Sequence, residues 1–137
     1  METKNISITT TVNASPVKVW DHWNTPEHIM QWNFASPDWH CPKAENDLKV
    51  GGKLTSRMEA KDGSFGFDFE GIYNEITPYE KISYTLLDGR QVITIFEEID
   101  DKTKITTTFE ADSQNPIEMQ RDGWQAIINN FKLYTEG

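Results

Sequence analysis

The stretch that decides the fold is residues 115–137, NPIEMQRDGWQAIINNFKLYTEG, at the end of the 137-residue chain. Asn115 is a preferred helix N-cap, Pro116 fits the first helical position, and Glu118 completes an N-x-x-E capping box. Apolar residues recur at helical spacing on one face, namely Ile117, Trp124, Ile127, Ile128, Phe131 and Tyr134. The sequence therefore predicts one long amphipathic helix whose apolar face covers another layer.

Gly123 lies inside this predicted helix, next to Trp124. A glycine in a helix interior costs about 1 kcal/mol relative to alanine. Its presence indicates a close approach of the helix backbone to a neighbouring segment or to a ligand, and helix packing alone is the favoured alternative.

The start of the chain predicts one strand followed by two short helices. Ser15-Pro16 and Thr25-Pro26 each place a capping residue before a proline, which is typical of helix starts. Residues 33–47 lack periodicity and predict a long ordered loop or lid. The first strand is predicted from alternation of polar residues with Ile6, Ile8, Thr10 and Val12.

The middle of the chain predicts about six antiparallel strands joined by tight turns. One strand begins at Gly51-Gly52, and Asp62-Gly63 supplies the turn to the next. A change of apolar phase after Gly71 predicts a β-bulge there. The strand after the Asp62-Gly63 turn carries three aromatic residues on one face, Phe65, Phe67 and Phe69.

This order of elements predicts an α+β fold for residues 1–137 as a single domain. Strands joined by hairpins need no crossover helices, so a doubly wound nucleotide-binding fold is not expected. The expected packing is a curved antiparallel sheet of about six to seven strands around the terminal helix.

Composition narrows the possible partners and the compartment. The formal net charge is −9 and the isoelectric point is near 4.7, so we expect no binding of nucleic acid or of an anionic membrane through charge. Cys41 is the single cysteine and cannot form an intramolecular disulfide, and no apolar N-terminal stretch resembles a signal peptide. The expected location is cytoplasmic.

The common motifs of catalysis and metal binding are missing from the sequence. G-x-S-x-G, H-E-x-x-H and paired C-x-x-C motifs do not occur. His22, His28, His40 and Cys41 have spacings that match no metal motif, so no metal, no cofactor and no catalytic residue are expected.

Two sets of charged residues allow alternative interpretations. Asp68 and Glu70 resemble a carboxylate pair, but they lie opposite the Phe face, where ion pairs with Arg57 are expected. Arg90 could orient a ligand carboxylate, and a solvated turn explains it equally well.

The combined motifs resemble a known superfamily. They are Pro26-Glu27-His28-Ile29, Trp32, Asp38-Trp39-His40-Cys41-Pro42, Gly51-Gly52, Gly71-Ile72-Tyr73 and Gly123-Trp124-Gln125-Ala126-Ile127. Together they are similar to the SRPBCC superfamily, specifically to bacterial domains related to the C-terminal part of the activator of the heat-shock protein 90 ATPase. The resemblance implies a START-like, helix-grip fold with a deep hydrophobic cavity between the sheet and the terminal helix.

Members of this superfamily bind lipids or small hydrophobic molecules, cyclise polyketides, sense hormones or act as co-chaperones. The leading hypothesis is a non-enzymatic domain that binds a small hydrophobic molecule or lipid, and Trp39 and His40 are expected in its covering loop. The expected binding residues are Trp32, Phe34, Trp39, His40, Met58, Phe67, Phe69, Tyr84, Trp124, Ile128 and Phe131.

Three alternatives remain open at this stage. One is a protein-interaction module that acts on a chaperone. Another is a cyclase-like enzyme, for which His40 is the first residue to test. A homodimer is also possible, because one predicted strand is apolar on both faces through Val92, Ile93, Ile95 and Phe96.

Overall fold

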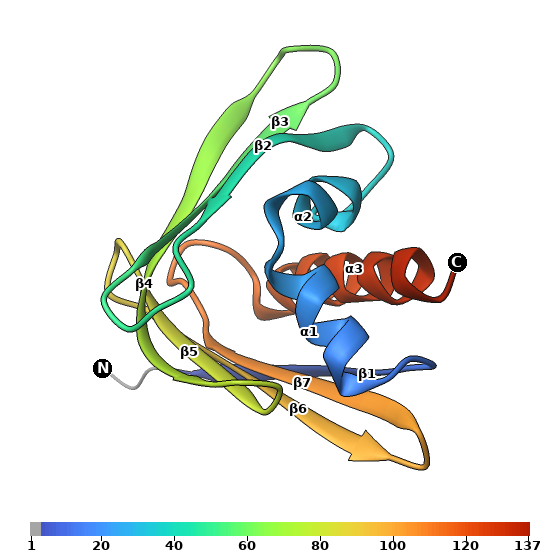
Figure 1. Cartoon of the computed structure of the whole chain (residues 1–137). Helices are drawn as coiled ribbons and strands as arrows, with labels where there is room; N and C mark the ends of the chain where they lie inside the picture. Colours follow the sequence, from blue (N-terminus) through green and yellow to red (C-terminus); the bar gives the residue numbers. More distant parts are fainter. Residues whose placement is uncertain (1–3) are drawn as a thin grey trace.

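The computed structural model describes residues 4–137 and shows an antiparallel sheet curled around one long helix (Figure 1). The helices are α1 (Pro16–Asn24), α2 (Pro26–Trp32) and α3 (Ile117–Glu136). The strands are β1 (Asn5–Val12), β2 (Trp39–Asn46), β3 (Lys53–Ala60), β4 (Gly66–Thr77), β5 (Lys81–Leu86), β6 (Gln91–Ile99) and β7 (Lys102–Glu110). The seven strands follow the order β1-β7-β6-β5-β4-β3-β2, which confirms the predicted α+β helix-grip layout.

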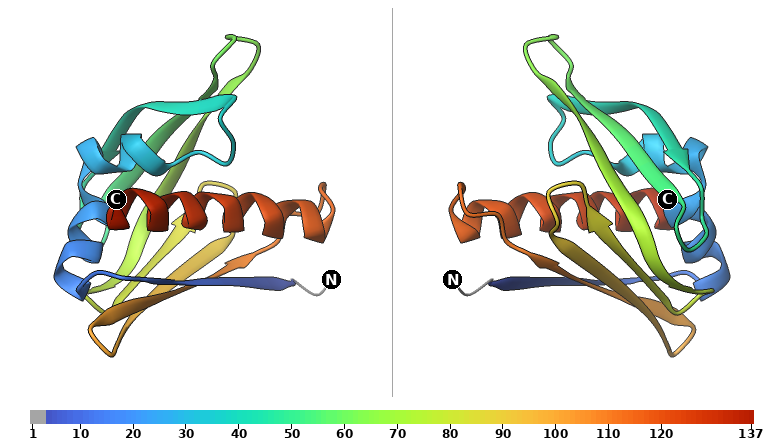
Figure 2. Two further views of the ribbon diagram at one scale, coloured as in Figure 1. Left: turned by 90° about the vertical axis from the view of Figure 1, so that its right-hand side faces the viewer. Right: turned by 90° about the vertical axis from the view of Figure 1, so that its left-hand side faces the viewer.

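The sheet bends so that its two ends face α3 from different sides. Figure 2 shows α3 lying above β1, while β2, β3 and the first part of β4 rise away from the rest of the sheet. We call these three segments the arm. The helices α1 and α2 close one end of the enclosed space, near the C-terminal end of α3 (Figure 2).

The contact between α3 and β1 protects an edge of the sheet. β1 is an end strand, and its outer carbonyl groups have no neighbouring strand. Gln125 Nε2 donates to the carbonyl of Thr9 at 3.1 Å, and Lys132 Nζ donates to the carbonyl of Thr11 at 2.7 Å. Side chains of α3 therefore replace the missing strand at these two positions.

Residues 39–46 form a strand rather than the predicted loop or lid. β2 pairs with β3 in antiparallel register, with an irregularity between His40 and Lys43. That irregularity and Pro42 interrupt the alternation that identifies a strand, and an edge strand accepts a proline because one side needs no hydrogen bonds. The loop prediction was wrong for β2, so Trp39 and His40 lie on a paired strand.

The bulge in β4 lies beyond Gly71. Gly71 pairs regularly with Leu54 and with Leu86, and the register shifts between Tyr73 and Glu75 instead. The predicted position was therefore wrong. Gly71 has another role, because a Cβ atom there would lie only 2.8 Å from Cδ2 of Tyr84 on the neighbouring strand.

The strand β6 is apolar on both faces, as its sequence indicates. Val92 and Phe96 are buried in the core, whereas Ile95 on the opposite face is 40% exposed. Pairing of two copies through this outer face stays a prediction.

Gly123 makes no close approach to another part of the described chain. A Cβ atom at this position would have no neighbour within 4 Å, so the predicted contact with a neighbouring segment was wrong. We therefore expect Gly123→Ala to raise the free energy of unfolding by about 0.5–1 kcal/mol, because alanine favours the helix. Urea denaturation measures this change.

The matched control is Gly71→Ala, in which the same methyl group meets the Tyr84 ring. We expect it to lower the free energy of unfolding by about 1–3 kcal/mol through overpacking. A destabilised Gly123→Ala protein would contradict the open environment of Gly123.

Candidate functional site

A cavity of about 220 Å³ lies between the concave face of the sheet and α3. Its wall is predominantly apolar. The aliphatic part comprises Ile8, Ile29, Leu54, Met58, Ile82, Ile127 and Ile128. The aromatic part comprises Trp23, Trp32, Phe67, Phe69, Tyr73, Tyr84 and Trp124.

The sequence hypothesis named eleven binding residues, and the structure brings most of them to this wall. Those on the wall are Trp32, Met58, Phe67, Phe69, Tyr84, Trp124 and Ile128. Those away from it are Phe34, Trp39, His40 and Phe131. Binding by any of them stays a prediction.

Two of the four residues away from the wall, Phe131 and Phe34, lie behind it. Phe131 is fully buried behind the wall, with its ring against Trp23 and Trp32 at centroid distances of 5.0 and 4.9 Å. The carbonyl of Phe34 accepts a hydrogen bond from Asn130 of α3 at 3.1 Å. These contacts support the wall from outside.

Trp39 and His40 lie at the start of β2 and point to opposite faces of the strand. Trp39 lies against Phe65 and Phe67, at centroid distances of 5.9 and 6.1 Å. His40 pairs with Glu59 at an Nε2–Oε1 distance of 3.8 Å, and its side chain is 41% exposed. Because consecutive strand residues point to opposite faces, Trp39 belongs to the aromatic cluster on the arm and His40 does not.

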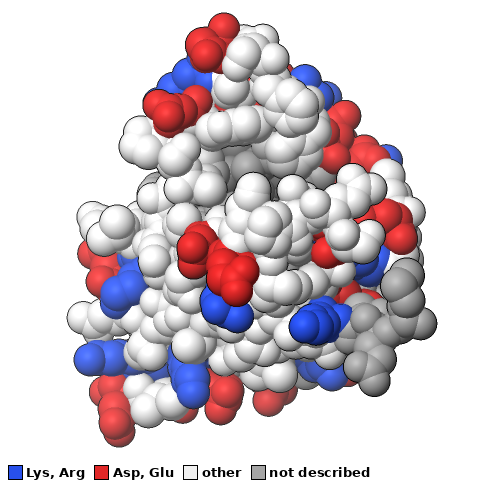
Figure 3. Space-filling model, turned by 180° about the vertical axis from the view of Figure 1, so that it is seen from behind, with Lys and Arg blue, Asp and Glu red and all other residues white. Residues whose placement is uncertain are grey.

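The mouth of the cavity lies beside this aromatic cluster. Phe67 is both on the cavity wall and 43% exposed, and its neighbour Phe65 is 62% exposed. From behind, Figure 3 shows a hollow between the upper part of the molecule and the body, with mostly uncharged atoms around it. Apolar side chains therefore continue from the interior to the surface.

One side of the cavity holds a closed hydrogen-bond network. The Tyr73 hydroxyl donates to Asn46 Oδ1, and Asn46 Nδ2 donates to the carbonyl of Asn24 at 2.7 Å. The Asn24 side chain then donates to the carbonyl of Trp20 at 3.0 Å. Burial raises the pKa of Tyr73, so its hydroxyl stays protonated. This network joins β4, β2 and α1, and its polar groups already have partners.

Tyr84 differs from Tyr73 in having a free hydroxyl. Within residues 4–137 this hydroxyl has no hydrogen-bond partner. Every side-chain nitrogen or oxygen atom of the described residues that is inaccessible to solvent does have a partner. The hydroxyl must therefore reach open space, and Tyr84 lines the cavity. Burial, and then the nearby Tyr73, raise the pKa of Tyr84, which keeps it a hydrogen-bond donor.

Sequence reasoning missed the polar side of the cavity. Asn46 lies on β2, for which the sequence predicts a loop, so its hydrogen bonds with Tyr73 and Asn24 were not expected. The only signal was Tyr73, which keeps the alternation of the preceding Phe residues.

The carboxylates lie mainly outside the cavity. Arg57 contacts Asp68 at 3.4 Å and Lys53 contacts Glu70 at 3.2 Å, as expected for the solvent face of β3 and β4. Glu45 is the one acidic residue on the described wall, and its side chain is 68% exposed and paired with Lys43 at 3.3 Å. The interior therefore offers phenols and amides rather than an acid–base pair.

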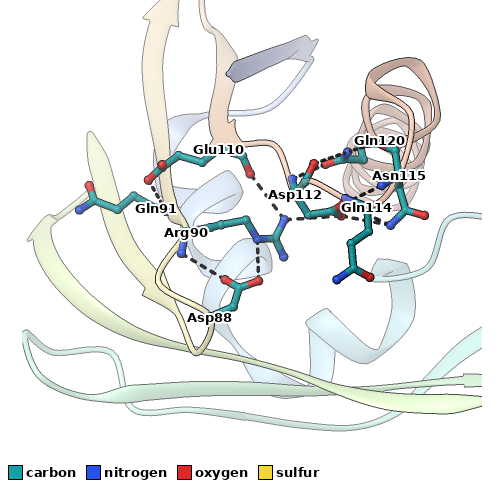
Figure 4. Close-up of polar contacts among 8 residues, drawn as sticks. All are labelled: Asp88, Arg90, Gln91, Glu110, Asp112, Gln114, Asn115 and Gln120. Atoms are coloured by element: carbon teal, nitrogen blue, oxygen red, sulfur yellow. Dashed lines mark hydrogen bonds and ion pairs between the residues drawn. The ribbon is translucent and has the colours of Figure 1, made fainter. Parts of the chain in front are cut away.

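A second hollow, at the N-terminal end of α3, is polar and internally paired (Figure 4). Arg90 Nε donates to Asp88 at 2.8 Å, and its Nη1 lies 4.0 Å from Asp112 Oδ2. Its guanidinium group is therefore already paired within the protein. This pairing agrees with the interpretation of Arg90 as a residue of a turn.

The N-terminus of α3 is held by residues other than the predicted capping box. Pro116 occupies the N-cap position without a side-chain hydrogen bond. Gln120 Nε2 instead donates to the carbonyl of Asn115 at 2.8 Å, and Gln120 Oε1 accepts from the backbone N–H of Asp112 at 2.9 Å (Figure 4). The capping-box prediction was wrong because the preceding loop folds back onto Gln120.

A family model for activator of Hsp90 ATPase homolog 1-like proteins matches residues 13–136. The solution structure of an AHSA1-like protein from Aeromonas hydrophila is similar, with 39% identity, a TM-score of 0.91 and coverage of 97% of this chain and 92% of that chain. A protein from Cytophaga hutchinsonii shares 50% identity, with a TM-score of 0.84 and coverage of 96% and 92%.

More distant structures share the fold. The crystal structure of a protein from Chromobacterium violaceum shares 21% identity, with a TM-score of 0.88 and coverage of 98% of this chain and 99% of that chain. At this identity the similarity shows the fold alone. No protein with a curated function gave a significant match. Among residues 4–137, none of the helices combines the length and apolarity that crossing a membrane requires.

The loop before α3 makes a testable contribution to stability. Although burial opposes it, hydrogen bonds from the backbone of Gln114 and from Asn115 lower the pKa of Asp112. Its carboxylate therefore stabilises the folded state at neutral pH, and this contribution disappears as the pH falls below the ordinary value of 3.8. We expect Asp112→Asn to lower the free energy of unfolding by about 1 kcal/mol at pH 7, as for loss of a helix cap.

Chemical denaturation at pH 7 and again near pH 2.5 checks this prediction. The difference between Asp112→Asn and the parent protein should shrink at the lower pH, because falling pH protonates the parent carboxyl group and removes its charge. Asp122→Asn removes the same charge from an exposed position on α3 and serves as the control. An equal difference at both pH values would contradict the role of the charge.

Proposed function

We propose that this chain, which belongs to the family of activator of Hsp90 ATPase homolog 1-like proteins, binds a small apolar or amphipathic molecule between the sheet and α3. The observation that carries the proposal is the free hydroxyl of Tyr84 within a predominantly apolar cavity. Ligand pockets combine apolar walls with a few polar groups that fix orientation. The SRPBCC fold, which commonly binds hydrophobic ligands, is consistent with this role.

The cavity size favours a compact ligand or one that extends through the mouth. Its volume of about 220 Å³ is below the roughly 300–1,000 Å³ of typical ligand pockets. Burial of about 200 Å² of apolar ligand surface would contribute about 5 kcal/mol before the costs of association. A longer ligand would place its remaining part along Phe67 and Phe65, which continue the apolar wall to the surface.

The polar groups favour a ligand with one hydrogen-bond acceptor. The hydroxyl of Tyr84 donates, because burial raises its pKa and keeps it protonated. The Tyr73 hydroxyl is already bound to Asn46 and adds no free group. A carbonyl, ether or hydroxyl oxygen in an otherwise apolar molecule matches this arrangement.

The same chemistry favours binding over proton transfer. A catalytic base needs a pKa near the working pH, whereas burial moves both cavity phenols away from it. Glu45 is largely exposed and paired with Lys43. The residues of the wall can therefore orient a ligand, and they supply no group placed to remove a proton.

The hydroxyl of Tyr84 can be tested without changing the shape of the cavity. A ligand is first identified by native mass spectrometry of the protein purified from its own cells, followed by gentle denaturation. We expect Tyr84→Phe to weaken binding of that ligand about 5–20-fold, the effect of one lost hydrogen bond, with little change in the free energy of unfolding.

Tyr73→Phe is the matched control, since it removes a hydroxyl that has a partner. It should lower the free energy of unfolding by about 1–3 kcal/mol because Asn46 loses its donor. Calorimetric titration and urea denaturation separate the two effects. Unchanged binding by Tyr84→Phe would contradict the proposed donor.

The apolar wall is tested by the double variant Phe67→Ala and Phe69→Ala. Phe67 is 43% exposed and Phe69 is half-buried, so removing these rings costs less stability than emptying a sealed core. We expect the ligand affinity to fall at least about tenfold while the chain stays folded by circular dichroism. Equal losses of folding and binding would show that the rings only fill the interior.

A further inference from the structure

The corner between α1 and α2 brings together three side chains that can bind a metal ion. A single residue, Thr25, separates the two helices, and the corner stacks the imidazole of His22 on that of His28. Their ring centroids lie 4.1 Å apart with an interplanar angle of 25°. Asp21 precedes His22, and one ligand atom from each of the three residues lies within 4.8 Å of the others.

Both histidines are oriented by hydroxyl groups of α3. His22 Nδ1 lies 3.2 Å from Thr135 Oγ1, and His28 Nδ1 lies 2.6 Å from the hydroxyl of Tyr134. When a histidine coordinates a metal through Nε2, its Nδ1–H needs an acceptor, and these hydroxyl oxygens can accept. The Nε2 atoms of both rings are then available as ligands.

Asp21 is oriented in the same way. Its Oδ1 accepts a hydrogen bond from Thr25 Oγ1 at 2.9 Å, and its Oδ2 lies 3.5 Å from His28 Nε2. Each of the three candidate ligands therefore has a supporting contact, and one ligand atom of each lies within 4.8 Å of the others. Such outer contacts accompany metal ligands in proteins.

We propose that Asp21, His22 and His28 bind a divalent first-row transition-metal ion of the Zn²⁺ type, with water completing the coordination. Two imidazoles and one carboxylate suit Zn²⁺, whereas Mg²⁺ and Ca²⁺ prefer all-oxygen sites. Bonds of about 2.0–2.1 Å place tetrahedral ligand atoms roughly 3.3 Å apart. Coordination requires the side chains to rotate so that the two imidazoles leave their stacked arrangement and point at one ion. The exposure of Asp21 (60%) and His28 (30%) leaves room for this rotation.

The arrangement explains why no metal motif is visible in the sequence. Zinc ligands usually repeat within one helix or one loop, whereas these residues come from two helices that meet at a proline corner. His40 and Cys41, grouped with them by residue type, lie on β2, where His40 faces Glu59 and Cys41 is buried. The proposal is independent of ligand binding in the cavity.

Calorimetric titration of the full chain, without an affinity tag, with ZnCl₂ tests the site. We expect one Zn²⁺ per chain, and His22→Gln and His28→Gln should each weaken binding at least about tenfold. His40→Gln is the matched control and should bind as the parent does. Absence of Zn²⁺ binding by the parent, or unchanged binding by both site variants, would overturn the proposal.

Further variants keep the test decisive if a histidine variant does not fold. Asp21→Asn changes an exposed ligand, and Tyr134→Phe removes the hydroxyl that supports His28, so each should weaken Zn²⁺ binding about 10–100-fold. Co²⁺ should give the absorption of a nitrogen–oxygen site without thiolate-to-metal charge transfer, which would otherwise implicate Cys41. Binding of Mg²⁺ as tight as that of Zn²⁺ would contradict the assigned ligands.

Discussion

One helix cannot cover the concave face of a seven-stranded sheet, and the rest of the structure follows from this mismatch. Seven strands spaced about 4.8 Å apart span roughly 29 Å, whereas a helix with its side chains is about 10–12 Å wide. The sheet curls to narrow the gap, and α3 is held along β1 by Gln125 and Lys132. The remaining space under β3, β4 and β5 is the cavity.

Three aromatic residues of the cavity wall differ in how far their contacts within the protein are satisfied. Trp124 stacks on Phe109 at a centroid distance of 4.0 Å, which uses one face of its ring within the protein. Tyr73 closes a hydrogen-bond network with Asn46, but Tyr84, at the next strand, has a hydroxyl with no partner among the described residues. Because this hydroxyl reaches the open space of the cavity, it stays available as a hydrogen-bond donor.

The sequence predicted those parts of the fold that depend on periodicity. The apolar face of α3 and the alternation of Phe67 and Phe69 are local patterns, and both led to residues of the cavity wall. β2 escaped prediction because its pairing with β3 comes from residues distant in sequence, while Pro42 and the irregular register hide its alternation. The network of Asn24 and Asn46 depends on that strand, so it could not be predicted either.

The anchoring of α3 differs between the two sides of the cavity. Gln120 fixes its N-terminal end through Asp112 and Asn115, and Glu136 accepts from the backbone of Asn13 at 2.8 Å near its C-terminal end. Among the described residues, hydrogen bonds join α3 to β1 and to the segment after α2, but none joins it to the arm. The contact of α3 with the arm is apolar, through Phe69 and Trp124 at 5.9 Å. Because apolar contacts are not directional, separation of the arm from α3 breaks no hydrogen bond between the two, whereas the bond from Asn46 Nδ2 to the carbonyl of Asn24 ties the arm to α1.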